Sequence, residues 1–344
     1  MEKTKQSKVL YLDVLRAMAC IIVVMFHSKG IYSDNVYSAN FWASNIFEAF
    51  ARIGVPLFVM ISGALMLNED YVSTPQKLKK HIMKMVFFFI IWSALYCVKF
   101  IFNGALNIWG ILTDFIKGPY HLWFVPMIIG LYLIVPLLRL WVKKENKKHV
   151  EYFLILSLLF ASLVPNMIGH LSAISPAFEI FNSLLSNLGI SYVLGHTGYF
   201  ILGWYLSTFE IKRKNTIIIL GGIGVFVTFF GTCVLSMIKG EYYTLSGNFR
   251  LGVILYAVGV FVFIKEIFQN KNYGDKKAYS FVNLLCSCSL GIYAIHAAIQ
   301  PLARQYINFE SAFLQIPIEF TITLVVSFGL AWIIRQIPIL KKII

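Results

Sequence analysis

The first long apolar run of this chain contains an arginine and a histidine, a combination that strongly constrains the fold. The run extends from Val9 to about Ile31. At 1.5 Å per residue it is long enough to cross a bilayer core of about 30 Å. Charged or titratable side chains are costly in lipid, so we expect Arg16 and His27 to face protein or water. Their spacing places both on one face of a helix, about 16 Å apart along its axis.

A simpler interpretation of this run is a packing helix, in which Arg16 snorkels toward one interface and His27 caps the other end. Two features argue against it. Arg16 lies about a third of the way into the span, and Asp13 accompanies it. A buried polar stripe is therefore the interpretation that we carry forward.

Composition extends this argument to the whole chain. Of its 344 residues, 58% are hydrophobic and 13% are charged, which is more apolar surface than a soluble domain can bury. We predict an all-α polytopic membrane protein with about ten transmembrane helices, in one transmembrane domain over 1–344 without an appended soluble domain. The predicted spans are roughly 9–31, 44–67, 83–102, 122–141, 150–170, 190–208, 216–238, 250–268, 281–303 and 313–335.

The distribution of positive charge predicts the orientation of the spans. With both termini cytoplasmic, 22 of the 30 Lys and Arg residues fall in short cytoplasmic segments and 5 fall in outer segments. This bias is a strong positive-inside signal. It also explains most of the net charge of +14, so we expect the lipid bilayer as a partner and no nucleic acid. The five cysteines lie in or beside apolar spans, and the histidines are scattered, so we expect neither a disulfide framework nor a metal site.

The second span contains Glu48 and Arg52 at its predicted outer end, followed by Pro56 and the small residues 62–64. Pro56 predicts a kink, and the small residues predict a close helix approach. Glu48 and Arg52 are four residues apart, so they form either a local ion pair or part of an outer polar pocket that also contains His27.

The third span begins with a basic cluster at the predicted cytoplasmic side, Lys80, His81 and Lys84. These side chains lie on adjacent turns, where they are able to hold an anion. The alternative is ordinary positive-inside charge in contact with lipid headgroups.

Histidines gather at the opposite side of the predicted membrane. Five of the seven map to the outer half, among them His121, His196 and His296. Each one taken alone is explained as a hydrogen-bonded interface histidine. Together they indicate a polar site, because histidine within a span usually marks one.

These residue types suit acyl transfer. A histidine of near-neutral pKa accepts a proton from a hydroxyl, and a deeper arginine binds phosphate or a developing negative charge. A phosphate-bearing acyl donor at the basic cytoplasmic mouth, such as coenzyme A, fits this arrangement. The chain has no Walker loop, dinucleotide fingerprint, GxSxG elbow or HExxH motif, which disfavours the chemistries that these motifs serve.

Several motifs of the chain resemble the membrane acyltransferase-3 family, bacterial integral-membrane O-acyltransferases of cell-surface glycans. The most specific is Arg16-x10-His27. The others occur in the expected order and cover essentially the whole chain: GVPLFVMISGALML at 54–67, HLWFVPMIIGLYLIVPLLR at 121–139, GHTGYFILGWYLS at 195–207 and SLGIYAIH at 289–296.

The resemblance implies that His27 is the catalytic histidine and that Arg16 is essential. The family often has Arg-x-x-Arg entering the third span. Here the matching positions are His81 and Lys84, which places bidentate phosphate binding by that pair in doubt.

We therefore expect a multi-pass O-acetyltransferase of the inner (cytoplasmic) membrane that moves acetyl from cytoplasmic acetyl-CoA to a hydroxyl of an exported or cell-surface glycan, or of its lipid-linked precursor. The alternatives are an exporter of a glycan or lipid-linked sugar, and the same enzyme type with succinyl-CoA as donor. The site residues that we expect are His27, Arg16 and Glu48 in catalysis, Lys80, His81 and Lys84 in donor binding, and Arg52, His121, Trp123, Tyr293 and His296 in the acceptor pocket.

Overall fold

The computed structural model describes residues 9–30, 32, 34–68, 71, 74–102, 108–171, 176–187, 189–271, 277–338 and 340–343. These residues form helices and the segments that connect them, with no strand among them. The α-helices are α1 (Leu10–Ser28), α2 (Ala39–Ala51), α3 (Gly54–Met66), α4 (Pro75–Phe102), α5 (Ile108–Lys117), α6 (Phe124–Leu133), α7 (Val135–Trp141), α8 (Lys147–Leu158), α9 (Val164–Leu171), α10 (Pro176–Asn187), α11 (Ile190–Thr208), α12 (Lys214–Lys239), α13 (Leu251–Phe268), α14 (Lys277–Tyr306) and α15 (Ala312–Gln336). A 3₁₀ turn covers Tyr120–Trp123, and a π-helical segment covers Leu159–Leu163. The predicted all-helical class is confirmed.

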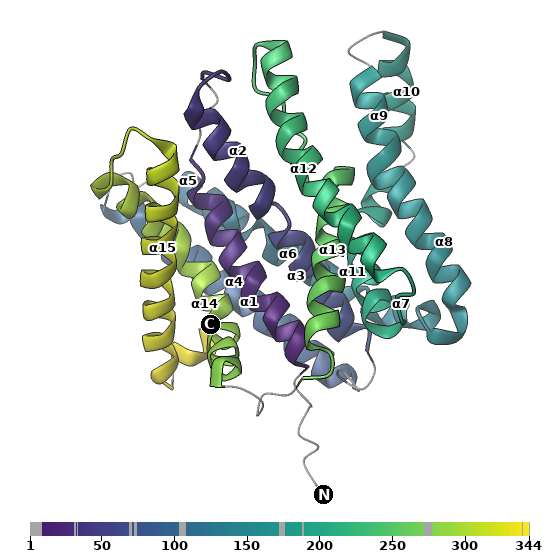
Figure 1. Ribbon diagram of the computed structural model, residues 1–344. Coiled ribbons are helices and arrows are strands. Elements are labelled where there is room, and N and C mark those ends of the chain that lie inside the picture. The colour runs from purple at the N-terminus through teal and green to yellow at the C-terminus, as the bar shows by residue number, and fades with distance from the viewer. Residues whose placement is uncertain are drawn as a thin grey trace, which may run out of the picture.

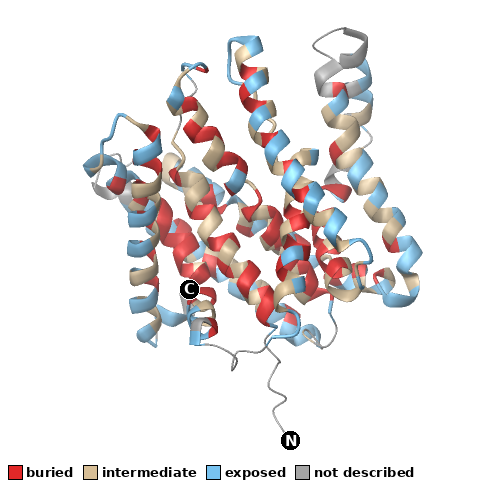
Figure 2. Cartoon of the chain, in the orientation of Figure 1, coloured by how far each residue is buried: buried red, intermediate tan, exposed pale blue. Residues whose placement is uncertain are grey.

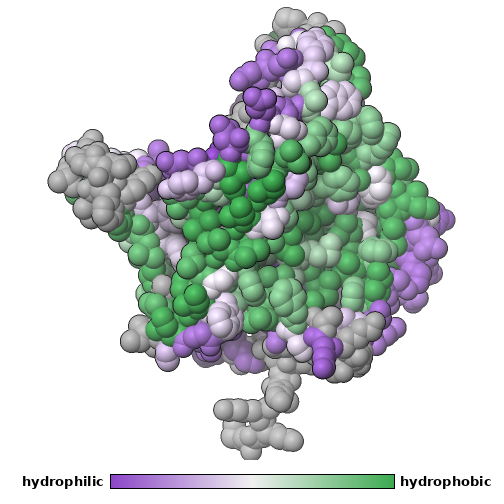
Figure 3. All heavy atoms as spheres, turned by 60° about the vertical axis from the view of Figure 1, so that its left-hand side comes forward, coloured by the Kyte–Doolittle hydropathy of each residue, from purple (hydrophilic) through white to green (hydrophobic). Residues whose placement is uncertain are grey.

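Most of the long helices have the length and composition of membrane spans. In the described part of the chain, eight helical stretches pass this test, or nine if the bent pair α6 and α7 counts as one span. Figure 3 shows the corresponding surface, a broad hydrophobic face with hydrophilic residues above and below it. Helix α11 coincides with the predicted span 190–208 but is not among the stretches that pass. The count of ten and the cytoplasmic termini therefore remain predictions.

Prolines mark two breaks in the predicted spans. The span 44–67 is divided into α2 and α3, and Pro56 lies in the first turn of α3. The span 122–141 is divided into α6 and α7, with Pro136 in the first turn of α7 and a bend of 49° between the two helices. A proline is tolerated in the first turn because its missing N–H has no intrahelical partner there.

Helix α1 lies at the centre of the bundle and packs against α2, α3, α13, α14 and α15. In Figure 1 it begins near the lower end of the bundle and rises between these helices. Figure 2 shows that buried residues concentrate on the inner helices, whereas α8, α12 and α15 present many exposed residues. The polar stripe of α1 is therefore enclosed by other helices rather than by lipid, as its sequence predicts.

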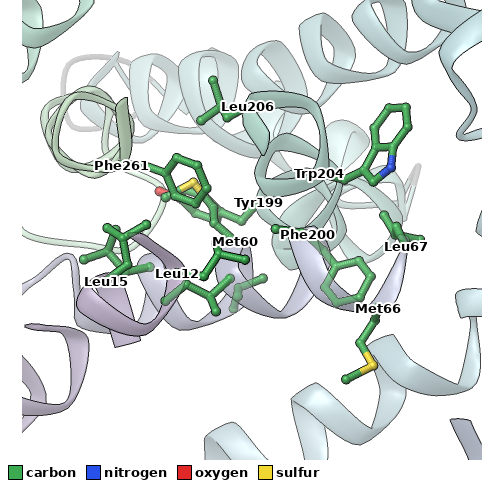
Figure 4. Close-up of a cluster of buried hydrophobic side chains, with 14 of the residues drawn as sticks. Leu12, Leu15, Met60, Met66, Leu67, Tyr199, Phe200, Trp204, Leu206 and Phe261 are labelled. Atoms are coloured by element: carbon green, nitrogen blue, oxygen red, sulfur yellow. The ribbon is translucent and has the colours of Figure 1, made fainter. Parts of the chain in front are cut away.

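Helices α3 and α11 approach each other closely enough to exclude any side chain at two glycines. A Cβ atom on Gly63 would lie 1.7 Å from the carbonyl oxygen of Phe200, and one on Gly203 would lie 1.9 Å from that of Met60. The close approach predicted for residues 62–64 is confirmed. Around this contact, Phe200, Met60 and Leu15 belong to a buried hydrophobic cluster that joins α11, α3 and α1 (Figure 4).

Two basic residues near the ends of predicted spans, Arg139 and Lys265, cap the ends of neighbouring helices. Arg139 donates from Nη2 to the carbonyl oxygen of Met66, at the end of α3, at 2.5 Å. Lys265 donates from Nζ to the carbonyl oxygen of Leu206, near the end of α11, at 2.6 Å. Cations at these positions satisfy carbonyls that have no partner inside the helix.

Candidate active site

A cavity of about 690 Å³ runs along the polar face of α1 and is lined by both Arg16 and His27. Helix α3, the α6 region and α14 supply most of its remaining walls. His81 and Lys84 of α4 line it together with Arg16, and His121 and Trp123 line it together with His27. One cavity thus contains residues of both predicted groups of site residues. We refer to it as the central cavity, with an Arg16 end and a His27 end.

Three imidazole rings meet at the His27 end. The ring centroid of His296, on α14, lies 5.1 Å from that of His27 and 5.3 Å from that of His121. His121 is carried by the 3₁₀ turn that precedes α6. Tyr120, on the same turn, packs edge-on against His27 with a centroid distance of 5.5 Å. No spacing along the sequence predicts this cluster, because its members come from three separate elements.

His296 does not line the central cavity but lies behind His27, fully buried. Its Nδ1 lies 3.3 Å from the carbonyl oxygen of Ile292, one turn earlier on α14. A proton on Nδ1 would satisfy this contact and leave Nε2 as an acceptor. Nε2 is buried and has no hydrogen-bond partner among the described residues. In that tautomer, His296 would present Nε2 as an acceptor beside the ring of His27.

A buried polar network, absent from the predicted site, supports the backbone of His27. Gln300 donates from Nε2 to the His27 carbonyl oxygen at 2.7 Å and to Glu319 Oε1 at 3.1 Å. Arg304 pairs with the same carboxylate at 2.9 Å. Two sequence signals could have found this network. Tyr293, His296 and Gln300 share one stripe of α14, and Glu319 is a carboxylate inside an apolar span.

Tyr293 and Trp123 line the central cavity near His27. Tyr293 donates a hydrogen bond from its hydroxyl to the carbonyl oxygen of His121, which attaches the 3₁₀ turn to α14. Trp123 is 44% exposed, and its ring centroid lies 6.0 Å from that of His196 on α11. These two aromatic residues form a wall and a rim of the site.

At the Arg16 end, the guanidinium is balanced by groups from two helices. Nη1 of Arg16 lies 3.3 Å from Asp13 Oδ1 on α1 and 3.3 Å from the Cys286 sulfur on α14. The thiol of Cys286 in turn lies 3.2 Å from the same carboxylate oxygen. Asp13 thus offsets part of the cost of burying the arginine, while the side chain still reaches the cavity.

The three predicted donor-binding residues of α4 are placed differently. His81 and Lys84 line the central cavity, and the His81 ring stacks on Tyr71 with a centroid distance of 6.2 Å. Lys80 is exposed and is not one of the residues that line the cavity. The structure therefore brings two members of the cluster to Arg16 and leaves Lys80 on the surface nearby.

Glu48 forms its ion pair with Lys29 and accepts a further hydrogen bond from Ser246. Tyr242 also donates to it, at 3.1 Å from Oε2. Burial beside this carboxylate raises the pKa of Tyr242 to about 12, so its hydroxyl stays protonated at neutral pH. Glu48 is thus held beside the His27 end by Lys29 and by the segment that joins α12 to α13. The catalytic role of Glu48 remains a prediction.

Arg52 is the second charged residue of the predicted outer pocket, and it lines the central cavity. Its guanidinium carbon lies 4.9 Å from the ring centroid of Phe26, which places the cation over an aromatic face. Its Nε is buried without a hydrogen-bond partner in the described part of the chain. Arg52 therefore presents positive charge to the same space as His27, and this observation favours the shared pocket over a purely local ion pair with Glu48.

The fold and site define a multi-pass membrane protein whose central helix carries a histidine and an arginine into one cavity. The model of the acyltransferase-3 family, described as an acyltransferase domain, matches residues 9–336. The chain belongs to this family and is a membrane acyltransferase. No curated protein and no solved structure matches it.

The described residues contain no group of three His, Cys, Asp or Glu side chains arranged to hold a metal ion. The expectation that the reaction needs no metal remains a prediction.

Proposed function

We propose that this acyltransferase moves an acetyl group from cytoplasmic acetyl-CoA to a hydroxyl of an exported or cell-surface glycan or of its lipid-linked precursor. One observation carries the proposal: a single cavity joins the basic groups around Arg16 to the imidazoles around His27. The helical rise between Arg16 and His27 separates the two ends by about 16 Å. An extended thioester arm spans this distance, whereas a nucleotide head stays at the Arg16 end.

The donor is held by positive charge at the Arg16 end. Lys84 and His81 line the cavity beside Arg16. Lys80 lies on the nearby surface, where it is exposed to solvent. Phosphates of coenzyme A are the anions that this group would bind. Because His81 and Lys84 are not arginines, they act as separate donors rather than as a bidentate fork. We therefore assign donor orientation to Arg16, which presents a planar guanidinium.

Acyl transfer takes place at the His27 end. The acceptor oxygen attacks the thioester carbonyl, and His27 accepts the proton of the hydroxyl as general base. The carbon–sulfur bond then breaks, a carbon–oxygen ester bond forms, and the proton passes from His27 to the leaving thiolate. The products are the acetyl ester and free coenzyme A, so atoms and charge balance.

The remaining groups orient the reactants. Arg52 faces the cavity near the reacting centre and stabilises negative charge on the tetrahedral intermediate. His121, Trp123 and Tyr293 line the acceptor pocket. His296 acts through His27, because it lies behind the catalytic ring and not against the cavity.

The proposal is tested with labelled acetyl-CoA added to the cytoplasmic face of sealed membrane vesicles. Wild type should release free coenzyme A and deposit acetyl ester in the glycan fraction on the opposite face. His27→Ala should bind acetyl-CoA without transfer. The matched control is His149→Ala, which removes an exposed histidine at the start of α8, and it should behave as wild type.

Two outcomes would separate the alternatives. Transfer from succinyl-CoA but not from acetyl-CoA would change the acyl group and keep the mechanism. Glycan translocation without consumption of either thioester would overturn the enzyme proposal and support the exporter. Acetyl transfer by His27→Ala at the wild-type rate would overturn the role of His27.

A further inference from the structure

Two smaller cavities lie beside the central cavity and have no part in the mechanism above. The first, which we call the lateral cavity, has a volume of about 320 Å³ and lies among α8, α11, α12 and α13. The second, the connecting cavity, has a volume of about 370 Å³ and lies between α6 and α11. Gly195 and Phe249 line both of them. The two cavities therefore meet at this glycine and this ring.

The lateral cavity is apolar and opens on a surface that faces lipid. Several of its lining residues are large, hydrophobic and partly exposed, including Ile155 at 56% and Leu251 at 41%. Ile155 belongs to the helical stretch Lys144–Ile168, and Leu251 belongs to α13, both of which have the length and composition of membrane spans. Its wall on α13 extends from Leu251 to Val258, about 10 Å along the helix axis. An apolar cavity that opens to the bilayer and runs along a spanning helix suits a hydrocarbon chain.

The connecting cavity leads from this apolar space toward the catalytic histidine. Asn248 lines the central cavity, and the next residue, Phe249, lines both smaller cavities. On the other side, Trp123 lines the central cavity and packs against His196, which lines the connecting cavity. The connecting cavity is thus separated from the central cavity by the backbone between Asn248 and Phe249 on one side and by the Trp123–His196 contact on the other.

The connecting cavity also offers polar groups to a ligand. His196 and Thr197 line it, and Nε2 of His196 is buried without a hydrogen-bond partner among the described residues. A buried polar atom without a partner is costly unless a ligand or water satisfies it. This nitrogen is therefore suited to bind the polar linker of an amphiphile whose hydrocarbon chain lies in the lateral cavity.

The wall of the lateral cavity contains the π-helical segment Leu159–Leu163, of which Ala161 and Ser162 face the cavity. Asn166 donates from Nδ2 to the carbonyl oxygen of Ser162 at 2.7 Å and to that of Phe249 at 2.9 Å. It therefore ties this irregular segment to the residue shared by both cavities. Segments of π-helix inside α-helices occur frequently at functional sites.

We propose that the acceptor is a lipid-linked glycan that enters sideways from the bilayer. Its hydrocarbon chain occupies the lateral cavity, its linker passes His196, and its sugar hydroxyl reaches His27. The inference rests on the proposed function and narrows the acceptor from any surface glycan to a membrane-bound precursor. A water-soluble polymer would make no use of an apolar cavity that opens to the bilayer.

The occupant is tested by photolabelling, which does not depend on activity. The probe is an isoprenyl phosphate sugar with a diazirine in its chain, incorporated with the protein into vesicles of phosphatidylethanolamine and phosphatidylglycerol. We expect crosslinks at residues of α8, α11 and α13 that line the lateral cavity, displaced by the unlabelled isoprenyl phosphate sugar. Equal labelling by phosphatidylglycerol carrying the same diazirine, or no labelling there, would overturn the inference.

The passage between the two smaller cavities is tested with a matched pair of glycine variants. Gly195→Leu places a side chain against Phe249, since a Cβ atom on Gly195 would lie 3.4 Å from the ring. Gly222→Leu on α12 is the control, because a Cβ atom there meets nothing within 4 Å. With labelled acetyl-CoA, Gly195→Leu should lower the acetyl ester in the solvent-extractable lipid fraction at least tenfold. Binding of acetyl-CoA should stay as in wild type, and Gly222→Leu should remain within twofold of wild type.

These outcomes separate the two proposals. Acetyl transfer found only in water-soluble glycan, or equal activity of both glycine variants, would overturn the lipid-linked acceptor and leave the acetyltransferase intact. No consumption of acetyl-CoA by wild type would overturn the proposed function, and the photolabelling would still decide what occupies the lateral cavity.

Discussion

The two ends of the central cavity differ in how their polar groups are paired. At the Arg16 end, a permanent charge is offset by Asp13 and contacted by the Cys286 thiol. At the His27 end, imidazole rings lie against one another, and His296 retains a buried nitrogen without a partner among the described residues. A buried cation needs compensation before any ligand arrives, whereas neutral imidazoles do not. We therefore expect the Arg16 end to bind the anionic donor and the imidazoles of the His27 end to exchange a proton with the substrate.

The largest effect should come from removing the base at the His27 end. We expect His27→Ala to lower the rate of acyl transfer by about 10²- to 10⁴-fold, the usual contribution of a general base. The dissociation constant for acetyl-CoA should change less than threefold, because the donor head lies at the other end. Calorimetric binding and single-turnover transfer measure the two quantities separately. Loss of binding in parallel with loss of rate would remove the distinction between the ends.

The converse effect is expected at the Arg16 end. Arg16→Ala should weaken acetyl-CoA binding by about 10- to 100-fold, since hydrogen bonds to charged groups contribute about 1.5–3 kcal/mol. Arg213→Ala, which removes an exposed arginine before α12, is the control and should bind as wild type. A variant of Arg16 that binds normally but fails in transfer would place the guanidinium in the chemical step instead.

A smaller effect is expected from His296, which lies behind the His27 ring. His296→Asn should lower the maximal rate about tenfold and leave the Michaelis constant for the donor unchanged, because His296 positions His27 without lining the cavity. His296→Gln, which keeps a reaching polar group, should recover part of the rate, and the pH–rate profile should differ between the two variants. Equal loss of activity and of thermal stability in both, with an unchanged profile, would make the role of His296 structural only.

The smallest effect concerns the thiol beside Arg16. Cys286→Ser should change transfer less than threefold, because the hydroxyl keeps a donor next to Asp13. In wild type, saturating acetyl-CoA should slow alkylation of Cys286 by a maleimide several-fold, measured by mass spectrometry of the labelled peptide. Cys97, on α4, does not line the cavity and is the internal control. Alkylation of Cys286 at the same rate with and without donor would place the donor elsewhere.

Sequence alone predicted what depends on one helix or on composition. The spacing of Arg16 and His27 places them on one face whatever surrounds α1, and the apolar runs predict the helices because lipid requires internally satisfied backbones. Small residues at 62–64 predicted a close helix contact, and Gly63 confirms it. The motifs of the chain were sufficient to predict the family.

Tertiary structure decided which helices meet and at what rotation. It brought His121 and His296 to His27 and paired Glu48 with Lys29. It also placed Glu319 against Gln300, whose side chain donates to the His27 carbonyl oxygen. Lys80 lies outside the central cavity, whereas His81 and Lys84 line it. Periodicity along one helix fixes relations within that helix, but contacts between helices depend on crossing and register. Those are set by packing at residues far apart in the chain, such as the contact of Gly63 with Phe200, so only the folded bundle reveals them.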